Sequence, residues 1–213
     1  MTAPAVSTPG IKRRAWLTAA GVGVLLVVAL LVNRATAKHA TSSPVHASLV
    51  AAAGLADCPT TTGTSAVKNG LPSLTFPCLA QGPKVTLAKL RGPALLNIWA
   101  GPCEDCKIEA PLLRSFAVAA RGRVAVLGVV DGAYNGSETW DDALDAAHGL
   151  TLGYPSVWDA KGALVQWTRA IGIPVTLFVR ADGTVAYRKV GRVAAGELEK
   201  LTSQYLGIDV PAS

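Results

Sequence analysis

Short apolar runs and turn signals alternate along the C-terminal part of the chain. Residues 94–100 ("ALLNIWA") and 124–130 ("VAVLGVV") are almost wholly apolar, as expected for strands buried on both faces of a sheet. Residues 174–180 ("PVTLFVR") and 184–190 ("TVAYRKV") flank "ADG", the strongest hairpin signal in the sequence. "SLTFPCL" and "KVTLAKL" bracket "AQGP" and predict a further hairpin ahead of the first buried run.

Helical segments separate these strands. Residues 104–120 follow the first buried run as a predicted helix, and Pro111 is expected to bend it. Ser137 is a candidate N-cap for a second helix with Glu138 in its first turn, and a last helix is predicted at 195–206. The order strand, helix, strand, helix, hairpin, helix predicts an α/β fold with a mixed sheet.

An uncharged apolar run occupies residues 15–32 ("AWLTAAGVGVLLVVALLV"). As a helix it would span roughly 27 Å, about the thickness of the hydrocarbon core of a bilayer. Basic residues precede it ("KRRAW"), so the sequence predicts a cytoplasmic tail at 1–14, a single-pass transmembrane anchor at 15–32 and an extracytoplasmic body. Two alternatives remain open, namely cleavage at an A-x-A site in 35–38 and twin-arginine export through "RRAWL".

The basic excess of the chain belongs to this N-terminal region. The formal net charge is +6, yet the remainder from residue 39 onward carries 15 basic against 14 acidic residues. A nearly neutral body argues against nucleic-acid binding. Residues 33–56 are rich in Ala, Ser and Thr, which predicts a tether with a weak helical pattern in "VHASLVAAAG", and the globular domain is expected at 57–213.

Four cysteines in an extracytoplasmic body are competent to form disulfides. Their positions suggest two pairs, Cys103 with Cys106 and a structural pair of Cys58 with Cys78. "WAGPCEDC" places the first pair after a buried strand and at the start of a helix, whose N-terminus stabilises a thiolate. Because the second sulfur can resolve a mixed disulfide, Cys103 is the predicted nucleophile and Cys106 the resolving cysteine.

A C-x-x-C pair can also be half of a zinc site. Four-coordinate zinc needs two further ligands. His39 and His46 lie in the predicted tether, and His148 stands alone. The sequence therefore favours redox chemistry over a metal site, and no metal or cofactor is expected because the cysteine pair itself carries the electrons.

Residues 71–206 resemble the TlpA/ResA-like membrane-anchored thioredoxins, including those of cytochrome c maturation. The matching stretches are "LLNIWAGPCEDCKIEAP", "YPSVWDAKGALVQWTRAIGIPVTLFVRADGTV" and "GRVAAGELEKL". The resemblance implies a thioredoxin fold, here with an N-terminal β-hairpin extension, and thiol–disulfide oxidoreductase activity.

Further site residues follow from this resemblance. Pro174, after Ile173, matches the cis-proline that faces the cysteines, where a missing N–H leaves neighbouring backbone open to a substrate peptide. Pro102 stands where the family usually has Trp, so an aromatic lid on the docking surface is missing. Asn97 occupies the place of a buried Asp in general thioredoxins, and Glu109 matches a glutamate near the active site.

Two of these residues have plainer interpretations as well. Glu109 lies about one turn past Cys106, where it can relay a proton or raise a thiol pKa, but it can equally be a solvated helix carboxylate. Asn97 can be a core polar residue that the backbone satisfies.

Two acids, Glu104 and Asp105, separate the cysteines. We hypothesise that they oppose the helix N-terminus and keep the Cys103 thiolate from becoming too stable, which favours a reductant. Alternatively, they are exposed carboxylates that the helix dipole favours at a helix start.

These features predict a membrane-tethered, extracytoplasmic oxidoreductase. By resemblance it reduces disulfides of exported proteins, with apocytochrome c as the first candidate, and a membrane thiol protein supplies its electrons. Two alternatives are an oxidase that introduces disulfides into secreted proteins and a non-catalytic module that binds extended peptides.

Overall fold

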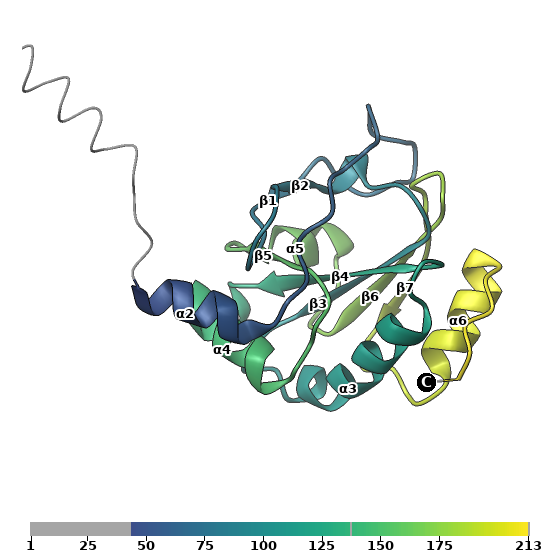
Figure 1. Ribbon diagram of the computed structural model, residues 1–213. Helices are drawn as coiled ribbons and strands as arrows, with labels where there is room; N and C mark the ends of the chain where they lie inside the picture. The colour runs from purple at the N-terminus through teal and green to yellow at the C-terminus, as the bar shows by residue number, and fades with distance from the viewer. Residues whose placement is uncertain (1–43, 137, 213) are drawn as a thin grey trace, which may run out of the picture. The chain divides into compact units, whose positions relative to one another are not determined.

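A five-stranded sheet forms the centre of the molecule (Figure 1). The computed structural model describes residues 44–136 and 138–212. The strands of the sheet, in chain order, are β3 (Ala94–Trp99), β4 (Ala125–Asp131), β5 (Ser156–Asp159), β6 (Val175–Val179) and β7 (Val185–Val190). They lie in the order β5-β4-β3-β6-β7.

The sheet is mixed, as the sequence predicted. Strand β3 pairs in parallel with β4 and antiparallel with β6, and β6 forms the expected antiparallel hairpin with β7. Every residue of β3 is buried, which agrees with its nearly continuous apolar sequence at the centre of the sheet.

Helices cover one face of the sheet (Figure 1). They are α3 (Glu104–Ala119), α4 (Trp140–Gly149) and α6 (Glu197–Leu206). Their buried side chains, such as Phe116 and Leu144, share a core with Leu95 and Phe178 of the sheet. Because side chains alternate along a strand, the odd-numbered positions of β3 face these helices.

The opposite face is covered by the shorter elements α5 (Ala163–Thr168) and the two-stranded sheet of β1 (Thr75–Phe76) and β2 (Val85–Thr86), with a 3₁₀ turn at Leu87–Lys89 (Figure 1). Leu96 and Ile98 of β3 lie in this second core. The pairing of β1 with β2 is the N-terminal hairpin that the sequence predicted.

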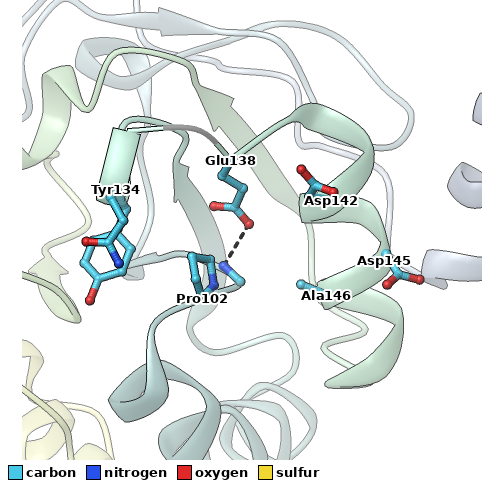
Figure 2. A pocket seen from close by; sticks show the side chains of 8 residues that line it. Pro102, Tyr134, Glu138, Asp142, Asp145 and Ala146 are labelled. Atoms are coloured by element: carbon cyan, nitrogen blue, oxygen red, sulfur yellow. Dashed lines mark hydrogen bonds between the residues drawn. The ribbon is translucent and has the colours of Figure 1, made fainter.

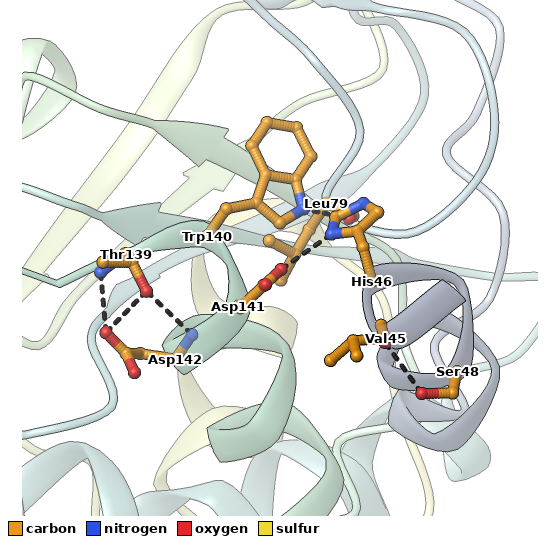
Figure 3. Close-up of polar contacts among 8 residues, drawn as sticks. All are labelled: Val45, His46, Ser48, Leu79, Thr139, Trp140, Asp141 and Asp142. Atoms are coloured by element: carbon orange, nitrogen blue, oxygen red, sulfur yellow. Dashed lines mark hydrogen bonds and ion pairs between the residues drawn. The ribbon is translucent and has the colours of Figure 1, made fainter. Parts of the chain in front are cut away.

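Some elements differ from the sequence prediction. Strand β5 and helix α5 were not predicted, because their four and six residues are too few to show a clear period. Ser137, the predicted cap of α4, lies outside the described residues. The helix starts at Trp140, and Thr139 and Asp142 form its capping box (Figure 3).

A further helix, α2 (Pro44–Ala53), forms within the predicted tether and packs on α4 (Figure 3). His46 Nδ1 lies 2.7 Å from Asp141 Oδ1, and His148 Nδ1 lies 2.6 Å from the carbonyl oxygen of Ala52. Ala53 at the end of α2 is buried in the main core. This part of the predicted tether therefore lies against the domain.

The predicted tail at 1–14 and anchor at 15–32 lie outside the described residues. Within the described part of the chain, no helix combines the length and the apolar character that crossing a membrane requires.

Cys58 and Cys78 form a disulfide, with their Cα atoms 5.8 Å apart. Cys78 belongs to the segment that follows β1 and runs beside β5. There the Leu79 N–H donates to the Ser156 carbonyl at 2.7 Å, and the Trp158 N–H donates to the Pro77 carbonyl at 3.0 Å. The disulfide thus ties the chain that follows α2 to the edge of the main sheet.

Replacing both Cys58 and Cys78 with Ser is expected to lower the free energy of unfolding by about 3 kcal/mol, because the crosslink closes a loop across 20 positions in the unfolded chain. Denaturant unfolding of the oxidised protein measures this difference. Peptide mapping of the unreduced protein is the direct check, and two free thiols at these positions would contradict the pairing.

Candidate active site

The cysteine pair lies where β3 leads into α3. Cys103 is the N-cap residue of α3, and its Sγ accepts the N–H of Cys106 at 3.2 Å. The two cysteines form a disulfide, and both side chains are buried, with 2% and 3% of their surface exposed. After reduction, the same N–H and the positive end of the helix dipole would favour a thiolate at Cys103.

The loop before β6 packs against this disulfide. Strand β6 pairs with β3, Val175 opposite Ile98, and this pairing brings Ile173 and Pro174 to the end of β3 that carries the cysteines. The Ile173–Pro174 peptide bond is cis. The carbonyl oxygen of Ile173 lies 4.0 Å from Cys103 Sγ, across 70 positions of sequence.

The surroundings of this loop are partly apolar and exposed. Pro102 is exposed beside Cys103, Ile173 is half-buried, and Pro174 is buried. Ile171, two positions before Ile173, is fully exposed, which is unusual for a large apolar side chain.

Glu109 is completely buried in the described structure, so it is not the solvated helix carboxylate that the sequence left open. Its Oε1 accepts a hydrogen bond from Asn97 Nδ2 at 2.7 Å, and its Oε2 accepts the N–H of Val193 at 3.1 Å. The carboxylate therefore joins α3 to β3 and to the segment before α6.

Burial raises the pKa of Glu109 from 4.5 to about 7. The hydrogen bonds from Val193 and Asn97 oppose this rise in pKa, and the nearby charge of Asp105 adds to it. Glu109 lies one turn after Cys106 on α3, on the same side of the helix. A carboxyl group with this pKa can exchange a proton at neutral pH.

Asn97 is 1% exposed, and its Nδ2 donates to side chains instead of to backbone. Besides Glu109, its Nδ2 donates to Thr176 Oγ1 at 3.2 Å, and Thr176 lies opposite Asn97 in the pairing of β3 with β6. Asn97 thus links the buried glutamate to the strand that follows Pro174.

Glu104 and Asp105 are exposed in the first turn of α3. Glu104 forms an ion pair of 2.7 Å with Lys107, and Asp105 lies 3.4 Å from Arg192. These cations and the solvent reduce the field of both acids at Cys103. The tuning hypothesis therefore stays a prediction, with a small expected effect.

One polar residue beside the Cys103 loop, Glu138, was not predicted to be a site residue. Burial raises the pKa of Glu138 from 4.5 to about 7, and its carboxylate accepts the N–H of Gly101 at 2.8 Å (Figure 2). Glu138 precedes the cap of α4, so it is not in the helical turn predicted for it. A pocket of about 400 Å³ lies next to it, between Pro102 and α4.

Solved structures with the same fold define the class of this protein as thioredoxin-like. A secreted disulfide oxidoreductase of Mycobacterium tuberculosis, homologous to Escherichia coli DsbE, matches with a TM-score of 0.51 at 23% identity, over 64% of this chain and 96% of that one. StoA from Bacillus subtilis matches with a TM-score of 0.52 at 24% identity, over 62% of this chain and 99% of that one. No protein-family model matches the chain.

The sequence relatives of this chain carry the names of thiol–disulfide exchange proteins. Sporulation thiol-disulfide oxidoreductase A of Bacillus subtilis is 25% identical over 124 residues, which are 58% of this chain and 74% of the relative. The thiol:disulfide interchange protein CycY of Rhizobium leguminosarum is 32% identical over 51% of this chain and 56% of its own length. DsbE of Pseudomonas fluorescens is 30% identical over 56% of this chain and 64% of its own length. The chain thus spans less than two thirds of the length of CycY and of DsbE.

The chain thus has a thioredoxin-like fold and its sequence relatives are named thiol–disulfide oxidoreductases and thiol:disulfide interchange proteins, which supports the resemblance to the TlpA/ResA-like thioredoxins.

Replacing Glu109 with Gln is expected to flatten the pH dependence of stability. The folded protein keeps the Glu109 proton up to a pKa of about 7, whereas the unfolded chain loses it near 4.5. The free energy of unfolding of the wild type therefore falls as the pH rises through this window, by up to roughly 3 kcal/mol. Denaturant unfolding at several pH values measures the slope. Glu104→Gln, an exposed carboxylate on the same helix, should keep the wild-type slope, and a wild-type slope in Glu109→Gln would contradict the assignment.

The double substitution Glu104→Gln and Asp105→Asn tests the two acids between the cysteines. Loss of both charges is expected to lower the pKa of the Cys103 thiol by about half a unit. If that pKa then falls below the working pH, the reduction potential becomes less negative. Thiolate absorbance against pH measures the change, and an unaltered Cys103 titration would leave these residues as ordinary helix-start carboxylates.

Proposed function

We propose that the protein is a membrane-tethered, extracytoplasmic thiol–disulfide reductant that acts on disulfides of exported proteins. The observation that carries this proposal is the Cys103–Cys106 pair at the start of α3, with Glu109 buried one turn further along the helix. Carboxylates near a cysteine pair disfavour thiolate, and a less stable dithiol form makes the pair a stronger reductant. Glu109, one turn after Cys106, and Glu138, which accepts the N–H of Gly101 two positions before Cys103, supply such carboxylates.

Reduction of a substrate would proceed in two exchange steps. The Cys103 thiolate attacks one sulfur of the substrate disulfide, a mixed disulfide forms, and the first substrate thiolate leaves. The Cys106 thiolate then attacks Cys103 Sγ, which releases the second substrate thiolate and closes the Cys103–Cys106 disulfide. Two electrons have passed from the protein to the substrate.

Glu109 would assist the second step. Cys106 must lose a proton before it can attack, and a carboxylate with a pKa of about 7 can accept this proton at neutral pH. Asn97 and the Val193 N–H would hold the carboxylate in place during the transfer, since both donate hydrogen bonds to it.

The substrate would dock as an extended peptide along the loop before β6. The Ile173 carbonyl beside Cys103 is available to a peptide N–H, and Pro174 has no N–H of its own to compete. Exposed Pro102 and Ile171 would supply apolar contacts on either side. The family suggests the C-x-x-C-H segment of apocytochrome c as the first substrate to test.

The cellular setting remains part of the proposal. The apolar run at 15–32 would anchor the chain, with the domain outside the cytoplasm. Each turnover leaves the cysteine pair oxidised, so a membrane thiol protein must return two electrons to it. No cofactor enters either exchange step.

The reduction potential of the Cys103–Cys106 pair decides between a reductant and an oxidant. A value near about −270 mV is expected for a reductant, whereas a value near about −120 mV would instead support the introduction of disulfides into secreted proteins. Equilibration with a glutathione or dithiothreitol buffer measures the potential. The Cys58→Ser, Cys78→Ser variant should titrate at the same potential, which assigns the signal to the active-site pair.

Cys106→Ser is expected to accumulate mixed disulfides with substrate proteins, because the sulfur that expels the bound substrate is gone. Cys103→Ser should trap little. Nonreducing gels of cell extracts measure the adducts. Equal trapping by both variants would reverse or remove the assigned roles, and full function of the double variant in cells would favour a non-catalytic peptide-binding module.

A further inference from the structure

We propose that Glu138 is a positioning residue of the redox site, which holds the loop that carries Cys103 and tunes the reactivity of its sulfur by gaining or losing a proton. The inference rests on the proposed function, since it assigns a residue to the same thiol chemistry.

The contact between Glu138 and the loop is direct. Glu138 Oε1 accepts the N–H of Gly101 at 2.8 Å, across 37 positions of sequence. Gly101 lies two positions before Cys103, so this hydrogen bond restrains the short connection between β3 and α3. Figure 2 shows the Glu138 side chain directed at the backbone beside Pro102, with the acids of α4 on the other side of the pocket.

The chain leaves room for this contact by having no side chain at position 101. A Cβ atom there would lie 2.6 Å from Glu138 Oε1 and 2.9 Å from Ala146 Cβ, closer than such atoms approach in proteins. Glycine therefore lets the backbone reach the carboxylate. Replacement by alanine would push the loop and Glu138 apart.

The second oxygen of the carboxylate is unusual. Glu138 Oε2 is buried and has no hydrogen-bond partner within the described residues. An ionised carboxylate with one unsolvated oxygen is costly, and a proton on that oxygen removes the charge. Structure and electrostatics thus agree on a group that changes its protonation state near neutral pH.

Among the described residues, the charged groups that line this pocket or act on Glu138 are acidic. Asp142 and Asp145 reach the pocket from α4, Asp131 lies at the end of β4, and Tyr134 adds a neutral phenol. Burial raises the pKa of Glu138 to about 7, the Gly101 N–H opposes that rise, and Asp142 and Asp131 add to it. The loop of Gly101 and Pro102 contributes no charge of its own.

A charge on Glu138 would act on the attacking sulfur. The carboxylate and Cys103 Sγ are separated by only a few backbone bonds and one hydrogen bond, a distance on the order of 10 Å. When Glu138 ionises, its negative charge raises the pKa of the Cys103 thiol and lowers the fraction of thiolate. Because less of Cys103 is then thiolate, attack on a substrate disulfide would be slower than with a neutral Glu138.

Glu138→Gln separates the two parts of this role. The amide oxygen can still accept the Gly101 N–H, whereas the side chain can no longer ionise. Glu138→Ala removes both the acceptor and the charge. Asp145→Asn is the matched control, because Asp145 is exposed and lines the same pocket without being the acceptor of the Gly101 N–H.

The measurement is the rate at which iodoacetamide alkylates Cys103 as a function of pH, in the Cys106→Ser protein. Glu138→Gln is expected to lower the pKa of the Cys103 thiol by about half a unit, which raises the alkylation rate below that pKa by about threefold. Asp145→Asn should leave the profile unchanged. Because Glu109 also has a raised pKa, the comparison is repeated in the Glu109→Gln background, where the effect of Glu138→Gln should persist.

Hydrogen exchange at the Gly101 amide reports whether Glu138 holds the loop that carries Cys103. Exchange should be faster in Glu138→Ala than in Glu138→Gln, which should match the wild type. An unchanged alkylation profile in Glu138→Gln, or an equal shift in Asp145→Asn, would overturn the tuning role. Equal exchange in all three proteins would overturn the positioning role.

The proposed function is tested separately from this inference. If Cys106→Ser traps substrates while Glu138→Gln alters nothing, the reductant function stands and the role of Glu138 falls. If Glu138→Gln shifts the Cys103 profile but no substrate is trapped, the role of Glu138 in thiol chemistry stands and the proposed function falls. Should Glu138→Ala fail to fold, the alkylation profile of Glu138→Gln decides alone.

Discussion

One buried carboxylate determines how the elements around the cysteines fit together. Glu109 has no exposed surface, so its oxygens need donors from the protein itself. Asn97 supplies one from β3 and the Val193 N–H supplies another from the segment before α6. Apolar packing is non-directional, whereas these hydrogen bonds restrain the orientation of α3 against the sheet. The position of Cys106, one turn away on the same helix, is fixed with it.

The electrostatics of the site result from two opposed contributions. The start of α3 directs a backbone N–H at Cys103 Sγ and favours negative charge there. Glu109 lies one turn after Cys106 on α3, whereas Glu138 accepts the N–H of Gly101 before Cys103, and burial raises the pKa of both carboxyl groups to about 7. Exposed acids on α3 count less, because Lys107 and Arg192 lie beside them. In our proposals, the tuning of the thiol is therefore assigned to the buried carboxylates more than to the acids that the motif displays.

The sequence predicts the centre of this fold well because its strong signals are local. Strand β3 is a nearly continuous apolar run, and α3 begins at the C-x-x-C pair, so both were predicted within a residue. The cis bond before Pro174 was expected from family resemblance. Strand β5 has four residues and becomes a strand only by pairing with β4, which no local pattern reveals.

Contacts between distant segments were harder to predict from the sequence. Nothing local distinguishes Glu138 from the other acids near α4, and its contact with Gly101 exists only because the chain folds the start of that helix against the active-site loop. The burial of Glu109 likewise depends on Asn97 from a neighbouring element. The family resemblance pointed to Asn97 and Glu109 but left open whether the glutamate was solvated.

In the proposed membrane-tethered arrangement, the docking of α2 on α4 would also limit the reach of the domain. With an anchor at 15–32, eleven residues (33–43) separate the membrane from α2, a contour of at most about 40 Å. Release of α2 from α4 would add its 10 residues to the tether and extend the contour length of the tether to roughly 75 Å. The volume that the cysteines can search grows steeply with that length, so their effective concentration at a membrane partner falls. If the run at 15–32 anchors the chain, as proposed, a docked α2 would keep the redox centre within this shorter distance of the bilayer, where electrons from a membrane donor would arrive.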